Sequence, residues 1–288
     1  MAVFKAFGKG IVRSCLKVRI LLDLWVINIL FSLLVAAPLL FLFRQDLGHS
    51  FLGRELRSFD FLWLGEAVHK FGNLGPAITG GLLAGAGLYL FLYVFLNGGI
   101  IGRLLDGGSG TRLAAFFGDC GRYFWRFLRL FLLSVPFYVI AFGILWSLLS
   151  AVLGPWERNA LTEWTVVILS AVETVFTLLL LTLVHMVFDY ARIIVVAEDE
   201  PWVIRALGRA FVFIGRRFFR SWGLYLLVGA FLLGGTALYL YTGRGIPSTG
   251  LAFLAVGILW GQAFIVFRLW IKMLFFSSQA EFYRVSRF

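Results

Sequence analysis

The amino-acid sequence contains six stretches of 20 or more mostly apolar residues, at positions 20–43, 77–101, 128–153, 164–188, 222–241 and 251–274. Each is long enough to cross a bilayer as an α-helix, which needs about 20 residues and satisfies its own backbone hydrogen bonds. Apolar residues make up 61% of the chain and charged residues 14%, whereas soluble domains have about 45–50% and about 25%. This composition excludes a water-soluble enzyme and a disordered chain. It predicts an all-α polytopic membrane protein, with residues 1–288 forming a single integral membrane domain.

The distribution of Lys and Arg predicts the orientation of these six spans, because basic residues concentrate in cytoplasmic loops. If the N-terminus is inside, the inner segments hold 20 of the 26 Lys and Arg residues and the outer segments hold 6. The sequence therefore predicts that both termini are cytoplasmic. We expect the first span to be an uncleaved anchor, since its apolar run exceeds the roughly 7–15 residues of a usual signal peptide.

Three segments beside the spans have the pattern of amphipathic helices that lie along a membrane surface: 1–19, 111–127 and 200–221, the last two on the cytoplasmic side. Such helices place cations against anionic headgroups and apolar side chains among acyl chains. Glu198, Asp199 and Glu200 precede Pro201, which is typical of a helix N-terminus. The residues expected to contact anionic lipids or a partner are Lys5, Lys9, Arg13, Lys17, Arg122, Arg126, Arg205, Arg209, Arg216 and Arg220.

Segments 111–127 and 200–221 align with each other at an offset of 94 residues. The same offset places span two on span four and span three on span five, which predicts a parallel internal repeat. The alternative is that two unrelated surface helices look alike because membrane interfaces select Phe and Arg. The matched pairs are Phe117 and Phe211, Gly121 and Gly215, Arg122 and Arg216, Phe124 and Phe218, and Arg126 and Arg220.

A resemblance to a known family rests on Asp189-Tyr190-Ala191-Arg192, Glu198-Asp199 and Arg205-Ala206-Leu207-Gly208-Arg209-Ala210. In these segments the chain resembles a broad group of uncharacterised bacterial six-helix inner-membrane proteins, akin to the membrane domain fused to some glycerophosphodiester phosphodiesterases. The resemblance covers spans two to five, and it implies a prokaryotic inner membrane and a fold without an established reaction. No segment of the sequence has the composition of a soluble phosphodiesterase domain, so the resemblance does not bring that activity with it.

The fourth span and the residues after it carry polar side chains on about half of the helix circumference. Ionisable groups inside a membrane are costly, which makes them candidates for a functional site. One interpretation is a pathway for protons or a polar solute. The other is that hydroxyl groups bond their own helix backbone while the charged residues pair locally. The candidates are Glu173, Thr177, His185, Asp189 and Arg192.

Motifs of the common hydrolases and nucleotide-binding proteins are absent from the sequence, so we expect no enzyme, no catalytic residue and no cofactor. Glu66 and His69 have the spacing of two metal ligands on one helical face, but the sequence lacks the second pair that a carboxylate-bridged site needs. We therefore expect no metal. Cys15 and Cys120 lie on the predicted cytoplasmic side, where thiols stay reduced, and we expect no disulfide.

Two functions from different classes fit these features. The first is a non-enzymatic structural or accessory subunit of a membrane complex, whose basic cytoplasmic face binds membrane lipids, especially anionic ones, and a protein partner or a second copy of the chain. The second is a transporter or lipid-handling permease with a polar pathway along the fourth span. Nucleic acid is not an expected partner, since the basic residues lie beside the spans and not in a basic soluble domain. The expected location is the bacterial inner membrane.

Overall fold

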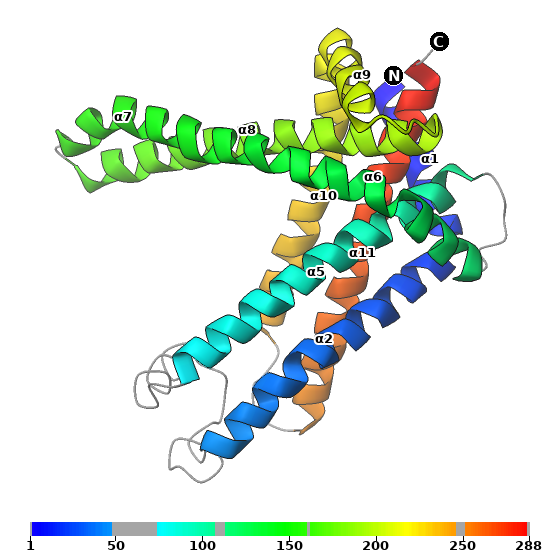
Figure 1. The fold of residues 1–288 in the computed structure, drawn as a ribbon. Coiled ribbons are helices and arrows are strands. Elements are labelled where there is room, and N and C mark those ends of the chain that lie inside the picture. Colours follow the sequence, from blue (N-terminus) through cyan, green and yellow to red (C-terminus); the bar gives the residue numbers. More distant parts are fainter. Residues whose placement is uncertain (1, 48–73, 107–112, 160–161, 246–250, 287–288) are drawn as a thin grey trace. The chain divides into compact units, whose positions relative to one another are not determined.

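The computed structural model describes residues 2–47, 74–106, 113–159, 162–245 and 251–286, and within these ranges the chain is helical without any β-strand (Figure 1). A π-helical turn, η1 (Ile140–Ile144), separates α6 from α7. The α-helices are α1 (Ala2–Leu16), α2 (Val18–Leu47), α5 (Leu74–Leu105), α6 (Leu113–Val139), α7 (Leu145–Arg158), α8 (Glu163–Ala197), α9 (Val203–Arg216), α10 (Phe218–Gly243) and α11 (Leu251–Ser286). The all-α class expected from the sequence is confirmed.

Six helical segments of the described chain are long and apolar enough to cross a membrane: Val18–Pro38, Thr79–Leu105, Leu113–Trp156, Glu163–Ala197, Phe218–Gly243 and Ala252–Ser286. They overlap the six predicted spans, and the chain is a multi-pass membrane protein. Large apolar side chains such as Leu83, Leu178 and Leu233 are exposed along these segments. Such side chains are stable in hydrocarbon and unfavourable in water, which agrees with helices that face lipid.

The surface segments differ in their boundaries from those predicted. Lys17 separates α1 from α2, and Arg217 separates α9 from α10. No break separates 111–127 from 128–153, because α6 continues to Val139. The interruption comes at η1, one turn after Pro136, whose ring nitrogen cannot donate a backbone hydrogen bond.

The chain divides into two compact units. Unit 1 comprises Met1–Lys17, Val94–Phe231 and Ile271–Phe288, and unit 2 comprises Val18–Tyr93 and Leu232–Trp270. Helices α5, α10 and α11 each contribute residues to both units. The expectation of a single integral membrane domain stays a prediction.

The core of unit 1 forms around the second half of α8, where every residue from 186 to 195 is buried. Helix α6 packs along α8, as does α9. The Phe213 ring of α9 lies 5.2 Å from the Tyr190 ring of α8 and 5.0 Å from the Tyr283 ring of α11, centroid to centroid. These contacts surround the stretch of α8 that contains Asp189.

Unit 2 is held by aromatic and close backbone contacts between its own helices. The Trp25 indole nitrogen of α2 donates a hydrogen bond to the Gln262 side-chain oxygen of α11, at 2.9 Å. The Tyr239 and Phe264 rings stack with their centroids 4.1 Å apart, which joins α10 to α11. Gly85 allows α5 to approach α2, since a Cβ atom there would lie 2.8 Å from a Val35 methyl group.

Candidate functional site

A chain of polar contacts joins the middle of α8 to α6 in unit 1. His185, Asp189 and Arg192 share one side of α8, because they are spaced by four and three residues. The Tyr138 hydroxyl of α6 lies 2.8 Å from His185 Nδ1, and His185 Nε2 lies 3.6 Å from Asp189 Oδ2. Arg192 Nη1 donates to Asp189 Oδ1 at 2.7 Å. The structure thus brings together three of the five intramembrane candidates.

Residues of α10 and α11 that belong to unit 1 lie beside this polar chain. The Tyr225 ring of α10 lies 6.4 Å from the His185 ring, and Lys272 of α11 interacts electrostatically with Asp189 and Arg192. The side chains of Asp189 and Arg192 are only 4% and 8% exposed. Burying a charge is costly unless an opposite charge is close. Asp189 is therefore the carboxylate that compensates two nearby cations. We call Tyr138, His185, Asp189, Arg192 and Lys272 the His185 group.

The other two candidates, Glu173 and Thr177, lie farther along α8. Both are buried, and the Glu173 carboxylate accepts a hydrogen bond from the Ser150 hydroxyl of α7. Along an α-helix the rise from Glu173 to His185 is about 18 Å, too far for contact. Three further hydroxyl groups on α8 bond carbonyl oxygens of their own helix, those of Ser170, Thr174 and Thr182. These contacts favour local pairing over a continuous polar pathway.

Asp199 joins the turn after α8 to α6. Its carboxylate accepts hydrogen bonds from Arg126 Nη1 at 2.6 Å and from Arg122 Nη2 at 2.7 Å. Its φ of 49° is in the left-handed region, which Asp tolerates better than most residues. The hydrogen bond from Arg126, with that from Arg122, lowers the pKa of the Asp199 carboxyl below its ordinary value. Arg122 and Arg126 therefore have a partner within the protein.

Glu198 and Glu200, on either side of Asp199, bind a basic residue of α9. Arg209 forms ion pairs with both carboxylates, at 3.2 Å for Glu200, and the Tyr283 hydroxyl of α11 donates to Glu198 at 2.5 Å. We expected these acidic residues in the first turn of a helix, but α9 begins at Val203. Their main partners are the side chains of Arg209 and Tyr283, and Glu200 also accepts a hydrogen bond from the backbone N–H of Trp202, just before α9, at 3.4 Å.

Four cations in or directly after α1 were predicted to contact lipid, and two of them interact with other residues of unit 1. Arg13 forms an ion pair with Glu281 of α11. Lys17 is only 9% exposed and interacts electrostatically with Asp106 at the end of α5, which does not favour the predicted lipid contact. Burial lowers the pKa of the Lys17 ammonium group. Lys17 is therefore buried, whereas periodicity alone placed it on the exposed side.

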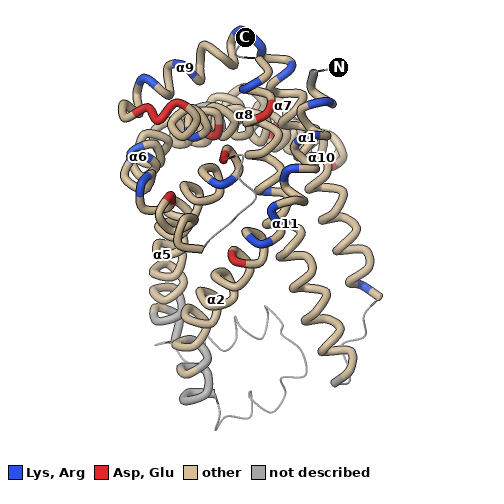
Figure 2. Tube along the Cα trace, turned by 90° about the vertical axis from the view of Figure 1, so that its right-hand side faces the viewer, with Lys and Arg blue, Asp and Glu red and all other residues tan. Residues whose placement is uncertain are grey.

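Half of the predicted contact residues are exposed and form no ion pair with another described residue. They are spaced along α1, α9 and the start of α10 (Figure 2). The five residues are Lys5, Lys9, Arg205, Arg216 and Arg220.

Helix α9 has three distinct sides. The first is buried and packs on α8; it consists of Val203, Ala206, Leu207, Ala210, Phe213 and Ile214. At 100° per residue, Arg205, Arg209 and Arg216 fall within about 40° of one another on a second side. Ile204 and Phe211 lie on the third side, where they are exposed. A helix of a soluble protein normally has no such exposed apolar side next to its cationic one.

Sequence reasoning missed the partners of these cations. The carboxylates of Asp199 and Glu281 and the hydroxyl of Tyr138 were not among the candidates, although each forms a contact with one of them. The scarcity of acidic residues could have indicated these partners. The chain has 15 Asp and Glu against 26 Lys and Arg, so each acidic residue in a basic segment has several cations with which it can pair. Glu66 and His69 lie outside the described residues.

Comparison with known proteins gives no relative from which a function could be transferred. No protein-family model, curated protein or solved structure matches the chain. The resemblance to bacterial six-helix inner-membrane proteins stays a prediction, as does the internal repeat. The function therefore has to be argued from the geometry of the chain itself.

Proposed function

We propose that the protein is a non-enzymatic polytopic protein of the bacterial inner membrane that binds anionic lipids through a basic cytoplasmic face and acts as a structural or accessory subunit of a membrane complex. The observation that carries this proposal is the three-sided form of α9. Its buried side fixes it to α8, its cationic side suits phosphate groups, and its exposed Ile204 and Phe211 suit acyl chains.

Helix α1 supports the same arrangement. Lys5 and Lys9 are exposed, and so are the apolar side chains of Phe4, Val12 and Leu16. Cations next to exposed apolar side chains are unfavourable in water alone but stable at the boundary between headgroups and acyl chains. The ion-paired residues of α6 and α9 are expected to contribute less, since their charge is already compensated within the protein.

The lipid proposal is tested by measuring which lipids stay bound to the purified protein. The wild type and the variant Arg205→Gln/Arg216→Gln/Arg220→Gln are extracted in mild detergent, and the retained lipids are quantified by mass spectrometry. Each cation near an anionic surface contributes about 1 kcal/mol, so the triple variant should retain at least about tenfold less phosphatidylglycerol. Phosphatidylethanolamine should change little.

The matched control is Arg158→Gln/Arg244→Gln, which removes exposed cations on the predicted outer side. It should retain as much phosphatidylglycerol as the wild type. Equal loss in control and test variants, or no loss in either, contradicts the lipid proposal. The subunit role is tested separately by cross-linking in native membranes: a chain that is never cross-linked to another protein is not a subunit.

The second candidate function is transport, and the His185 group is the observation that favours it. Tyr138, His185 and Asp189 form a short series of groups that can exchange protons, in a segment where charge is costly. Reconstituted vesicles with a pH-sensitive dye test this idea. Proton flux that is lost in His185→Leu and in Glu173→Leu supports transport. A wild-type protein without flux excludes proton transport, and flux unchanged in both variants excludes this pathway.

A further inference from the structure

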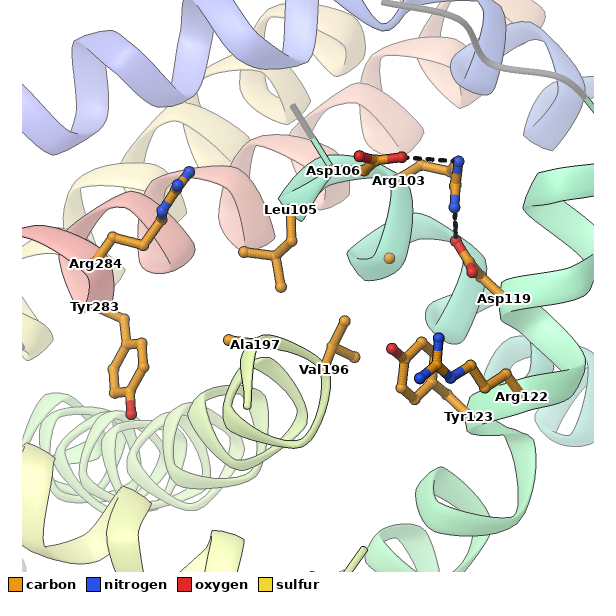
Figure 3. Close-up of a pocket in the computed structure, with 11 residues that line it drawn as sticks. Arg103, Leu105, Asp106, Asp119, Arg122, Tyr123, Val196, Ala197, Tyr283 and Arg284 are labelled. Atoms are coloured by element: carbon orange, nitrogen blue, oxygen red, sulfur yellow. Dashed lines mark hydrogen bonds and ion pairs between the residues drawn. The ribbon is translucent and has the colours of Figure 1, made fainter. Parts of the chain in front are cut away.

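A cavity of about 490 Å³ lies in unit 1 among α5, α6, α8 and α11 (Figure 3). Its volume falls in the range of small-molecule sites, about 300–1,000 Å³. Leu105, Val196 and Ala197 form an apolar part of its lining. Apart from Gly102, charged and phenolic groups supply the rest: Arg103, Asp106, Asp119, Arg122, Tyr123, Tyr283 and Arg284.

Two guanidinium groups of this lining share their carboxylate with a second cation. Arg122 pairs with Asp199, which also binds Arg126. Arg284 lies 3.8 Å from Glu281, beyond hydrogen-bond distance, and Glu281 is paired with Arg13. Both side chains are 56% exposed, so their unused N–H donors are accessible. In each case two cations therefore share one carboxylate.

The remaining charges of the lining are compensated locally. Arg103 donates to Asp119 at 2.7 Å and to Asp106 at 3.0 Å. Asp106 also attracts the buried Lys17. This corner balances two carboxylates with two cations and leaves the excess positive charge on Arg122 and Arg284.

Tyr123 adds a hydroxyl donor to the lining and restricts the Arg122 side chain. The Arg122 guanidinium lies over the Tyr123 ring, 5.4 Å from its centroid, which restricts the side chain. In Figure 3 both side chains extend from α6 toward the cavity, and Arg284 lies across it on α11. Arginine binds phosphate oxygens with two parallel hydrogen bonds, so each of these guanidinium groups can donate to a phosphate-bearing ligand in the cavity.

We infer that this cavity is a discrete binding site for a phosphate-bearing ligand, held by Arg122 and Arg284 with the Tyr123 hydroxyl as an additional donor. The ligand is the phosphate headgroup of a lipid or a soluble phosphate. The site is separate from the exposed cations of α1 and α9, so it predicts saturable binding in addition to the general preference for anionic lipids.

The test is isothermal titration calorimetry on the full chain in non-ionic detergent, with inorganic phosphate and with short-chain phosphatidic acid as probes. Saturable binding of at least one probe is expected. Arg122→Gln and Arg284→Gln should each weaken it about tenfold, which corresponds to the loss of a charge-assisted hydrogen bond. Binding of phosphatidic acid alone identifies a lipid site, whereas binding of both probes identifies a site for the phosphate group itself.

Arg126→Gln is the matched control, because Arg126 binds the same Asp199 carboxylate but does not line the cavity. It should bind the probe like the wild type, and Tyr123→Phe should weaken binding without removing a charge. Absence of binding to the wild type, or equal loss in Arg126→Gln and Arg122→Gln, overturns the inference. The triple α9 and α10 variant should bind normally, so the cavity and the surface proposals fail independently.

Discussion

Gly10 of α1 lies so close to Ser278 of α11 that a Cβ atom at position 10 would be 2.9 Å from the Ser278 Cα atom. The neighbouring Ser277 hydroxyl donates to the Gly10 carbonyl oxygen at 3.2 Å. Because the close atom belongs to the backbone, no rotation of a side chain relieves the contact. Helix α1 is therefore fixed to α11 by direct backbone packing, in addition to the Arg13–Glu281 ion pair.

Gly10→Ala should destabilise the protein by about 1–3 kcal/mol, since the added methyl group overpacks a closed contact. Thermal unfolding in detergent measures the loss as a lower Tm. Gly8→Ala is the control: nothing lies within 4 Å of a Cβ atom there, and the better helix propensity of Ala should leave stability unchanged or raise it by up to about 1 kcal/mol. Equal effects of the two substitutions would contradict this packing.

Asp189→Leu should be the most damaging single change in the His185 group. It removes the carboxylate beside Arg192 and Lys272, and a buried charge that loses its partner typically costs about 3–5 kcal/mol. The yield of monodisperse protein and its Tm should both fall. Glu163→Gln, at the exposed start of α8, should change neither. A stable Asp189→Leu protein would show that the two cations do not depend on this carboxylate.

Tyr138→Phe removes only the hydroxyl that contacts His185 Nδ1. We expect a loss of about 1 kcal/mol, the usual contribution of one hydrogen bond. Tyr241→Phe provides the comparison, because Tyr241 is 77% exposed. Unfolding of both variants in the same detergent measures the difference. If Tyr138→Phe unfolds at the wild-type temperature, the contact contributes nothing to stability.

The stabilisation by Asp199 should depend on pH. Hydrogen bonds from Arg126 and Arg122 lower its pKa, so its contribution is present above the ordinary value of 3.8 and is lost as the pH falls further. Asp199→Asn, which tolerates the left-handed φ, should lower stability near neutral pH by at most about 1 kcal/mol because the Asp199 and Arg122 side chains are about half exposed. The two unfolding curves should converge in acid. A difference that is constant with pH would contradict the ionic contribution.

Topology can be tested without purification. A reporter fused after residue 160 should lie outside the cytoplasm, and one fused after residue 288 should lie inside it, because basic residues mark the cytoplasmic side. A cytoplasmic reporter at position 160 would contradict the six-span orientation.

The all-α class and the six long apolar helical segments of the described chain could be predicted because a membrane imposes one dominant requirement on sequence. Backbone groups in hydrocarbon must bond within their own helix, and apolar runs of sufficient length report this directly. The clustering of His185, Asp189 and Arg192 followed from spacing on one helix. Contacts between helices, such as Tyr138 with His185 or Asp199 with Arg126, depend on packing that no local pattern encodes.

The charged residues illustrate the same limit. Periodicity placed Lys17 on the exposed side of a surface helix, but the residue is buried directly after α1 and interacts electrostatically with Asp106. Likewise, Arg122 and Arg126 follow the pattern of a lipid-binding face, yet both bind one carboxylate in the turn before α9. Asp199, a single residue in a turn, pairs with both arginines. Local sequence patterns carry the least information in turns, so this pairing could not be predicted.

The π-helical turn η1 determines which way α7 faces. A π-helical turn holds one residue more than a regular turn, so it absorbs a residue that in a regular α-helix would rotate everything after it by about 100°. If the same residues continued as a regular α-helix, the Ser150 hydroxyl would point away from the Glu173 carboxylate, to which it now donates. The irregular turn therefore acts as a spacer that sets the rotational register of the two antiparallel helices α7 and α8.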